Sequence, residues 1–147
     1  FAARALGRNL PGNFWSPSGW DNVMSEGNEV STRWAEAYLA RTDHLVPTGF
    51  GVKPAAGLYV LEQAAIATGG TDPAELRQAI VSEDFLTPLG KTTFRPEDHQ
   101  GICPLLFSKF EPDEGDDGWR RTEQELVSYD DVLDMTEPPS PGERFEG

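Results

Sequence analysis

Hydrophobic residues recur with a helical period in the first half of the chain. Between residues 28 and 42, Val30, Trp34 and Tyr38 stand four positions apart, with charged residues between them. This spacing predicts a helix that packs one face against the rest of the protein. Asn28 precedes the run and is a residue type that caps helices, so we expect the helix to begin immediately after it.

The next predicted helix, residues 54 to 68, is apolar on nearly every side. Leu58, Leu61 and Ala65 form its main stripe, and neighbouring positions are apolar too. Pro54 suits the first turn of a helix, where a backbone N–H has no partner within the helix. We therefore expect a helix that begins at Pro54 and is buried on most of its surface.

A third helix is predicted over residues 73 to 82 by the strongest local signal in the chain. Gly69 and Gly70 end the preceding helix, and Asp72 then stands at the capping position ahead of Pro73. Glu75 is placed to return a hydrogen bond to the backbone of Asp72, as in a capping box.

The hydrophobic period changes after residue 90. Three β-prone segments follow and predict an antiparallel meander, which makes the chain α/β, with the helices first. A helix over residues 1 to 6, a strand over 13 to 15 and a turn over 16 to 19 are expected upstream. The predicted strands of the meander cover residues 91 to 95, 105 to 110 and 125 to 129.

The last residues are rich in proline and glutamate. Residues 136 to 147 contain too few apolar side chains to offset the entropy of ordering, so an extended tail is expected. The predicted organisation is one folded unit over residues 1 to 135 and a tail over 136 to 147.

Composition narrows the choice of partners. The 147 residues include 25 acidic and 12 basic side chains, for a net charge of −13. Such a surface repels phosphate, so we expect no nucleic-acid partner and no attraction to anionic membranes. The single cysteine, Cys103, excludes an internal disulfide.

No pattern of catalytic or metal-binding residues stands out. His44, His99 and Cys103 are the only soft metal ligands, and no second pair completes a tetrahedral site. The acidic segment from Asp113 resembles a calcium loop, but Gly115 stands at position three, where an oxygen ligand is needed, and Gln124 stands at position twelve in place of glutamate. We expect no metal, no cofactor and no enzymatic activity.

Aromatic residues are the better candidates for a binding site. Phe14, Trp15 and Trp20 lie close together before the first long helix, and Phe50 stands between two glycines. Core packing is the ordinary role of large aromatic side chains. The alternative is that Trp15, Trp20 and Phe50 line a cleft and contact a ligand, and both interpretations stay open.

The order of several motifs resembles one protein family. Residues 58 to 80 are similar to the helix–"AGS-D"–helix unit of the leucine/isoleucine/valine-binding-protein family, the type I periplasmic binding proteins. Residues 85 to 94 resemble the family's "f-x-T-x-x-G-x-x-x-F" segment. Residues 15 to 17 and 34 to 38 resemble its "w-x-P" and "F-x-x-x-Y" motifs. The similarity extends over almost the whole chain in the family's order.

This resemblance implies the C-terminal portion of a two-lobed fold whose lobes are joined by a hinge of three crossovers. It implies an extracytoplasmic protein that binds a small amino-acid or amide-like solute and delivers it to the membrane subunits of an ABC importer. Phe50 falls near the position of a ligand-contacting aromatic residue in leucine-binding members. Ala56 stands where the family often has tyrosine, so that contact is missing.

Other roles remain open at this stage. A ligand-sensing regulator or a receptor ectodomain can use the same fold, and a free-standing acidic interaction domain is a third possibility. The chain begins with Phe1, inside a helical pattern, from which we expect a processed or truncated piece of a longer protein.

Overall fold

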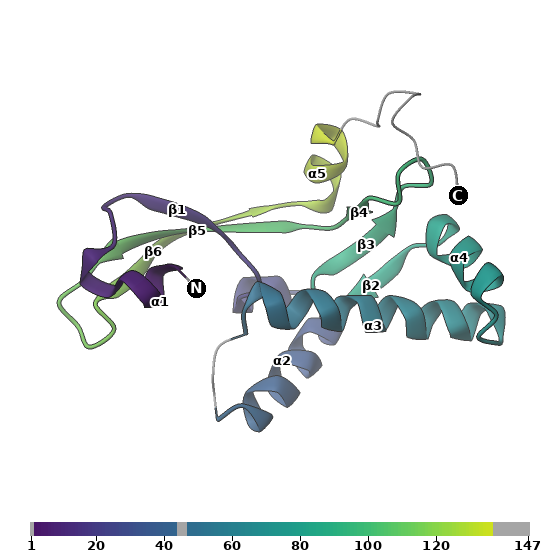
Figure 1. Ribbon diagram of the computed structural model, residues 1–147, viewed down its shortest axis with the longest axis horizontal. Coiled ribbons are helices and arrows are strands. Elements are labelled where there is room, and N and C mark those ends of the chain that lie inside the picture. The colour runs from purple at the N-terminus through teal and green to yellow at the C-terminus, as the bar shows by residue number, and fades with distance from the viewer. Residues whose placement is uncertain (1, 44–46, 137–147) are drawn as a thin grey trace.

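The chain folds into a mixed arrangement of helices and antiparallel strands, as expected (Figure 1). The structure is a computed structural model that describes residues 2–43 and 47–136. In chain order its elements are α1 (Ala2–Leu6), the 3-10 turn η1 (Gly7–Asn9), β1 (Phe14–Ser18), the 3-10 turn η2 (Asn22–Ser25), α2 (Glu29–Arg41), α3 (Gly49–Thr68), α4 (Pro73–Ser82), β2 (Phe85–Thr87), β3 (Gly90–Phe94), β4 (Gly101–Ile102), β5 (Leu105–Pro112), β6 (Trp119–Val127) and α5 (Tyr129–Met135).

The strands form two small sheets instead of one meander. One sheet has the order β1-β5-β6 and the other has the order β2-β3-β4, with antiparallel pairing throughout. In Figure 1 the first sheet lies on the left with α1, and the second lies on the right beside α4. The strand β4 of the second sheet is separated from β5 of the first sheet by residues 103 and 104 alone, so the chain passes directly from one sheet into the other.

Two local predictions in the first sheet are wrong. Of the turn expected over residues 16 to 19, residues 16 to 18 are instead the second half of β1, and only Gly19 lies in a bend. Pro17 pairs with Phe107 of β5. Because β1 is an edge strand, one side of its backbone needs no partner and a proline is tolerated there. The strand predicted over 125 to 129 begins at Trp119 and ends at Val127. Its first half is mostly charged and polar, so the alternation of apolar and polar residues that indicates a strand is absent there.

The helix α5 was not predicted. Ser128 caps it by accepting a hydrogen bond from the Asp131 backbone N–H at 3.2 Å. Tyr129, expected at the end of a strand, is its first residue, and its hydroxyl hydrogen-bonds Thr93 of β3 at 2.8 Å. The short strands β2 and β4 were also missed, because two or three residues are too few to show a period.

The caps of α2 and α4 confirm the two strongest local predictions. Asn28 and Asp72 each accept hydrogen bonds from two backbone N–H groups in the first turn of their helices. The reciprocal bond expected from Glu75 is not formed among the described residues. The cap of α4 therefore rests on Asp72 alone, with Pro73 in the first turn.

The helix α3 begins at Gly49, five residues before the predicted start. Pro54 lies inside it, where proline removes one N–H and therefore leaves one carbonyl in the preceding turn without its usual donor. That carbonyl belongs to Phe50, whose surroundings are open to solvent, because 84% of the residue is exposed. Pro54 lies in the second turn of α3, close to the end where proline is best tolerated, and the helix continues through it.

The buried face of α3 organises the core. Val52 and Ala56 pack in one cluster of buried residues, whereas Val60 and Ala64 pack in a second cluster with Phe85 of β2. These four positions of α3 recur every fourth residue and form one stripe. The helix α3 therefore contributes buried residues to both clusters and connects them. The first cluster consists of Trp20, Met24, Ala35, Val52, Ala56, Leu89 and Leu106.

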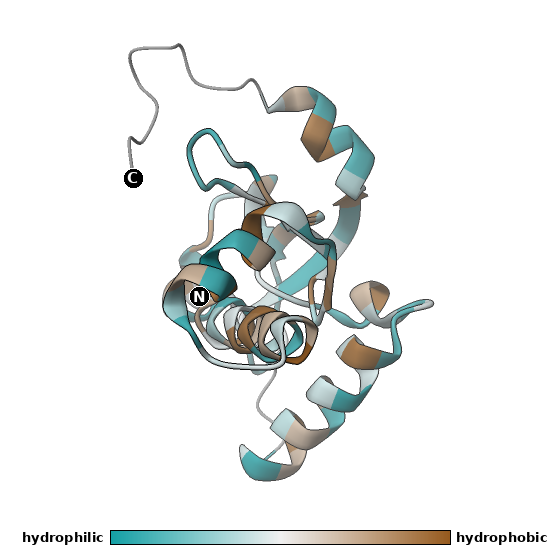
Figure 2. Ribbon diagram, turned by 90° about the vertical axis from the view of Figure 1, so that its right-hand side faces the viewer, coloured by the Kyte–Doolittle hydropathy of each residue, from teal (hydrophilic) through white to brown (hydrophobic). Residues whose placement is uncertain are grey.

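The stripe of α3 predicted to be buried is exposed instead. Leu58 is 68% exposed and Leu61 is 47% exposed, whereas Ala65, the third residue of the predicted stripe, is half-buried. Ile66 beside it is 74% exposed. Figure 2, which looks along α3, shows hydrophobic residues around most of its circumference. Hydropathy alone could not select the packed face, because both faces of this helix are apolar.

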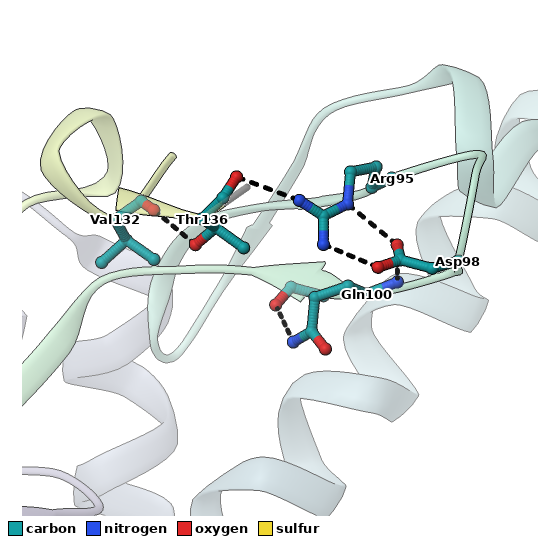
Figure 3. Close-up of polar contacts among 6 residues, drawn as sticks. Arg95, Asp98, Gln100, Val132 and Thr136 are labelled. Carbon is teal, nitrogen blue, oxygen red and sulfur yellow. Dashed lines mark hydrogen bonds and ion pairs between the residues drawn. The ribbon is translucent and has the colours of Figure 1, made fainter. Parts of the chain in front are cut away.

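A charged cluster ties the end of α5 to the turn between β3 and β4 (Figure 3). The Arg95 guanidinium donates to both carboxylate oxygens of Asp98, at 2.9 and 2.6 Å, and to the backbone carbonyl of Thr136 at 3.1 Å. Thr136, the first residue of the predicted tail, also donates through its hydroxyl to the Val132 carbonyl. The rest of that tail, residues 137 to 147, lies outside the described residues.

We expect the stability of the fold to fall in acid as Asp98 becomes protonated. The hydrogen bond from Arg95 lowers the pKa of the Asp98 carboxyl to about 2, with help from the Gln100 backbone N–H. In an unfolded chain this pKa is about 3.9. The ionised carboxyl therefore stabilises the folded state above about pH 4, and this contribution is lost as the pH falls through about 2.

The measurement compares urea unfolding of the original chain and of Asp98→Asn across this acidic range. The difference in unfolding free energy should be constant at neutral pH and should shrink toward zero near about pH 2. Asp116→Asn serves as the control for net charge, because Asp116 makes no ion pair in the part of the chain that the structure describes. A difference for Asp98→Asn that did not change with pH would contradict the assignment.

Candidate functional site

An open cleft of about 840 Å³ lies between α1, the first sheet and the beginning of α3. Figure 1 shows the elements that supply its lining residues, with α1 and the first sheet on the left of the view and the long helix α3 beginning beside them. Clefts of this volume are of the size that holds small molecules. Its described lining residues are Ala2, Ala3, Arg4, Ala5, Phe14, Ser16, Pro17, Ser18, Gly19, Trp20, Pro47, Thr48, Gly49, Phe50, Lys53, Phe110, Trp119 and Arg121.

A backbone contact between two glycines fixes the base of this cleft. A Cβ built on Gly49 would lie 3.3 Å from the Gly19 Cα, and a Cβ built on Gly19 would lie 1.9 Å from the Gly49 nitrogen. No residue other than glycine fits this approach at position 19. The contact brings the end of β1 directly against the first turn of α3, so the two walls of the cleft meet there.

The three aromatic residues predicted to contact a ligand have different surroundings. Trp20 is 5% exposed, packs in the first core cluster and donates its indole N–H to the Ser31 hydroxyl at 2.8 Å. Phe50 is 84% exposed at the mouth of the cleft. Trp15 is 41% exposed and is not among the described lining residues. The structure thus brings Trp20 and Phe50 together and leaves Trp15 apart.

The charged residues of the lining are all basic. Arg4, Lys53 and Arg121 come from α1, α3 and β6, and no aspartate or glutamate is among the described lining residues. In a chain with 25 acidic and 12 basic residues, such a lining is a local reversal of charge. The partial positive charge at the beginning of α3 has the same sign. The cleft therefore favours anions.

Arg121 already forms an ion pair with a neighbouring residue. Its guanidinium forms a hydrogen-bonded ion pair with Asp21 and lies 6.0 Å from the centre of the Phe110 ring. The Phe110 ring in turn meets Trp119 edge-on, with 5.4 Å between ring centres. Phe110, Trp119 and Arg121 form the wall of the cleft on the side of the first sheet. The carboxylate of Asp21 compensates most of the charge of Arg121.

Lys53, unlike Arg121, has no ion-pair partner among the described residues. The other two lysines of the chain pair with carboxylates, Lys91 with Asp84 at 2.9 Å and Lys109 with Glu123 at 2.7 Å. Lys53 is exposed, and no carboxylate of the described residues lies within ion-pair distance of it. Burial raises the pKa of the nearby Cys103 thiol, and the charge of Lys53 opposes that rise. Cys103 packs against the first core cluster as a neutral thiol.

The basic residues of the cleft were not predicted from the sequence. Arg4, Lys53 and Arg121 are separated by large parts of the chain and belong to no motif. No local signal distinguishes them, because an isolated arginine or lysine is an ordinary surface residue. Phe14, noted among the crowded aromatic residues, lines the cleft, whereas the candidate Trp15 beside it does not.

The described lining of the cleft consists of apolar, aromatic, hydroxyl-bearing and basic residues. Nowhere in residues 2–43 and 47–136 do three or more histidine, cysteine, aspartate or glutamate side chains gather in a way that could hold a metal ion. His44 lies outside the described residues. None of the described helices is both long and apolar enough to span a bilayer.

Solved structures share this fold. An ABC-type branched-chain amino acid transporter from Rhodopseudomonas palustris superimposes with a TM-score of 0.72 at 20% identity, over 94% of this chain and 35% of the other. A periplasmic binding protein from Burkholderia mallei gives 0.63 at 16% identity, over 88% and 34%. A solute-binding protein of an ABC transporter from R. palustris, in complex with 3,4-dihydroxybenzoic acid, gives 0.58 at 15% identity, over 84% and 34%.

These likenesses define the fold of the chain. It has part of the two-lobed type I periplasmic-binding-protein fold, as the sequence motifs indicated. The chain spans about a third of the length of the structures that it matches. No protein-family profile matches its sequence. No curated protein sequence matches it either.

Proposed function

We propose that this chain is part of the extracytoplasmic solute-binding component of an ABC importer. The observation that carries the proposal is the open cleft at the beginning of α3, found in a chain whose fold is that of substrate-binding proteins. The cleft combines apolar and aromatic side chains with a few charged groups, which is the usual composition of a small-molecule site. Its role is binding, and we propose no catalytic step.

Trp20 and Phe50 are the proposed ligand contacts from this chain. Phe50 is exposed at the mouth of the cleft, so a bound molecule would cover an apolar ring that now faces water. Trp20 is held by its hydrogen bond to Ser31 and supplies a rigid floor. Trp15 was proposed with them from the sequence, but it stands outside the described lining. Its contact would need a ligand that extends beyond this cleft.

The proposed solute is a small molecule of the amino-acid or amide-like class. One structural neighbour is described as a branched-chain amino acid transporter, and another was solved with 3,4-dihydroxybenzoic acid. Both solutes pair a carboxylate with an apolar or aromatic body. The membrane subunits of the importer are the proposed macromolecular partners.

The chain would act as the C-terminal part of a longer two-lobed protein. Its matches are about three times its length, which leaves room for a second wall over the open cleft. In this scheme the ligand is held because it binds the closed arrangement of the lobes better than the open one. We propose the division expected from the sequence, a folded part over residues 1–135 and a tail over residues 136–147. Thr136 hydrogen-bonds to Arg95 and Val132 of the folded part, and residues 137–147 lie outside the described residues.

The test is a thermal-shift screen of the complete gene product against amino acids and small amides. At a ligand concentration about a hundredfold above Kd, binding stabilises the folded state by about 2.7 kcal/mol, which raises the melting temperature by several degrees. We expect such a rise for a small set of related solutes. Phe50→Ala should reduce the rise without lowering the melting temperature of the free protein, because this residue is exposed. The proposal fails if no solute of the panel shifts the transition.

A further inference from the structure

The reversal of charge in the cleft limits what it can bind. The chain carries a net charge of −13, yet the three charged side chains among the described lining residues are all cationic. A ligand with an ammonium group finds no carboxylate of this chain to pair with in that lining. A ligand with a carboxylate finds partners on three elements, α1, α3 and β6.

The three cations do not contribute equally. Arg121 is bound to Asp21, so the pair presents little net charge to a ligand. Arg4 lies on the short helix α1 and is exposed. Lys53 lies in the second turn of α3 on the same wall as Phe50, is exposed, and has no carboxylate within ion-pair distance among the described residues. Arg4 and Lys53 therefore both keep unused charge, since neither has a carboxylate of the described residues within ion-pair distance, and Lys53 is the one that lies on the same helix as Phe50, three residues after it.

The rest of the lining accepts an apolar body. Phe14, Trp20 and Phe50 present aromatic surface, and Pro17 and the alanines of α1 add aliphatic surface. Burying such surface is favourable in proportion to its area. A molecule that matches both the basic side chains and the apolar surface of this cleft has a carboxylate at one end and an aliphatic or aromatic group at the other.

We propose that this cleft selects small organic carboxylates, with Lys53 contacting the carboxylate and Phe50 covering the apolar body. This inference rests on the proposed function as a solute-binding protein and names the class of solute. The recognised group on this chain is the carboxylate alone. An α-ammonium group adds no contact to this wall of the cleft.

Three ligands with one body and different polar ends test the proposal. The complete gene product is titrated by calorimetry with 3-phenylpropanoate, 3-phenylpropanamide and 3-phenylpropylamine. Charge-assisted hydrogen bonds are about twice as strong as neutral ones, so the carboxylate should bind at least about tenfold more tightly than the amide. The amine should bind most weakly. The preference for the carboxylate should also shrink as salt is added, because Lys53 is exposed and is screened.

Substitutions connect this preference to one residue. Lys53→Gln should lower the affinity for the carboxylate about tenfold and leave the affinity for the amide unchanged, whereas Lys53→Arg should keep most of the preference. Arg77→Gln is the matched control, because it removes one positive charge from α4, outside the described lining of the cleft. Arg77→Gln should leave the affinities for the carboxylate and for the amide nearly unchanged, because a distant exposed charge is screened by salt.

The possible results distinguish a failure of the carboxylate assignment from a failure of the proposed solute-binding function. If the three ligands bind equally, if the amine binds best, or if Lys53→Gln weakens all three alike, the carboxylate assignment is overturned while solute binding stands. If neither this series nor any amino acid or amide binds the complete gene product, the proposed function fails and the inference fails with it.

Discussion

Replacing Gly19 with alanine should lower the free energy of unfolding by about 3 kcal/mol, the upper end of the range for overpacking. The added Cβ would lie 1.9 Å from the Gly49 nitrogen and 2.0 Å from its Cα. Both atoms belong to backbone, so no side chain can rotate away, and β1 and α3 must separate. The separation would also disturb Trp20, the next residue, which packs in the first core cluster.

Gly57→Ala is the matched control for this substitution. Gly57 lies inside α3, and nothing stands within 4 Å of the position that its Cβ would occupy. Alanine is the better helix former, so this change should raise stability by about 0.5–1 kcal/mol. Urea unfolding of both variants gives the comparison. An unfolding midpoint of Gly19→Ala equal to that of the original chain would show that the contact between β1 and α3 does not exist in solution.

The same substitution should weaken binding if the cleft is the solute site. Gly19, Gly49 and Phe50 lie at the join of its two walls, so pushing β1 away from α3 moves Phe50 relative to Trp20. A displacement of this kind alters the fit of any ligand that touches both aromatic rings. Stability and affinity are therefore linked at this join by geometry.

Helix caps were the part of the fold most readily predicted from the sequence. Asn28 and Asp72 act on N–H groups two and three residues ahead, so all the information needed lies within one turn of the chain. Their helices begin where predicted. The expected reciprocal bond from Glu75 depends on a flexible exposed side chain, and it is not formed in the described structure.

Features that depend on distant residues were predicted less well. The buried stripe of α3 is selected by its neighbours, since Val60 packs on Phe85 of β2 and on α4, while Leu58 on the opposite side meets no such partner. Both stripes are apolar, so hydropathy could not distinguish them. The division into two sheets depends likewise on β1, which lies about ninety residues from β5 in sequence and yet pairs with it.

The candidate site was predicted only through its aromatic residues. Trp20 was singled out because aromatic residues crowd the segment before the first long helix, and Phe50 because it stands between two glycines; both line the cleft. Lys53 and Arg121 were not, because an isolated basic residue in a sequence says nothing about which carboxylates will surround it. The fold provides that information when it pairs Arg121 with Asp21 and leaves Lys53 without a carboxylate among the described residues.

The 147-residue chain on its own should not bind solute with measurable affinity. Its cleft is open, and Phe50 and Lys53 face solvent, so a bound carboxylate would keep much of its contact with water. An ion pair about 4 Å long is worth about 1 kcal/mol in water and several times more at the lower effective dielectric of a closed site. The second wall of a two-lobed protein supplies that closure, and here it would be missing.

Calorimetry of this chain and of the complete gene product against the same acids and amino acids tests this expectation. The complete protein should give saturable heat, whereas the chain alone should give none. The chain should also associate as its concentration rises, because Leu58, Leu61 and Ile66 leave an apolar stripe of α3 facing water. Sedimentation velocity over a range of concentrations measures this, and Leu58→Glu should reduce it. Micromolar binding by the chain alone would contradict the argument, since it would place a complete site within these residues.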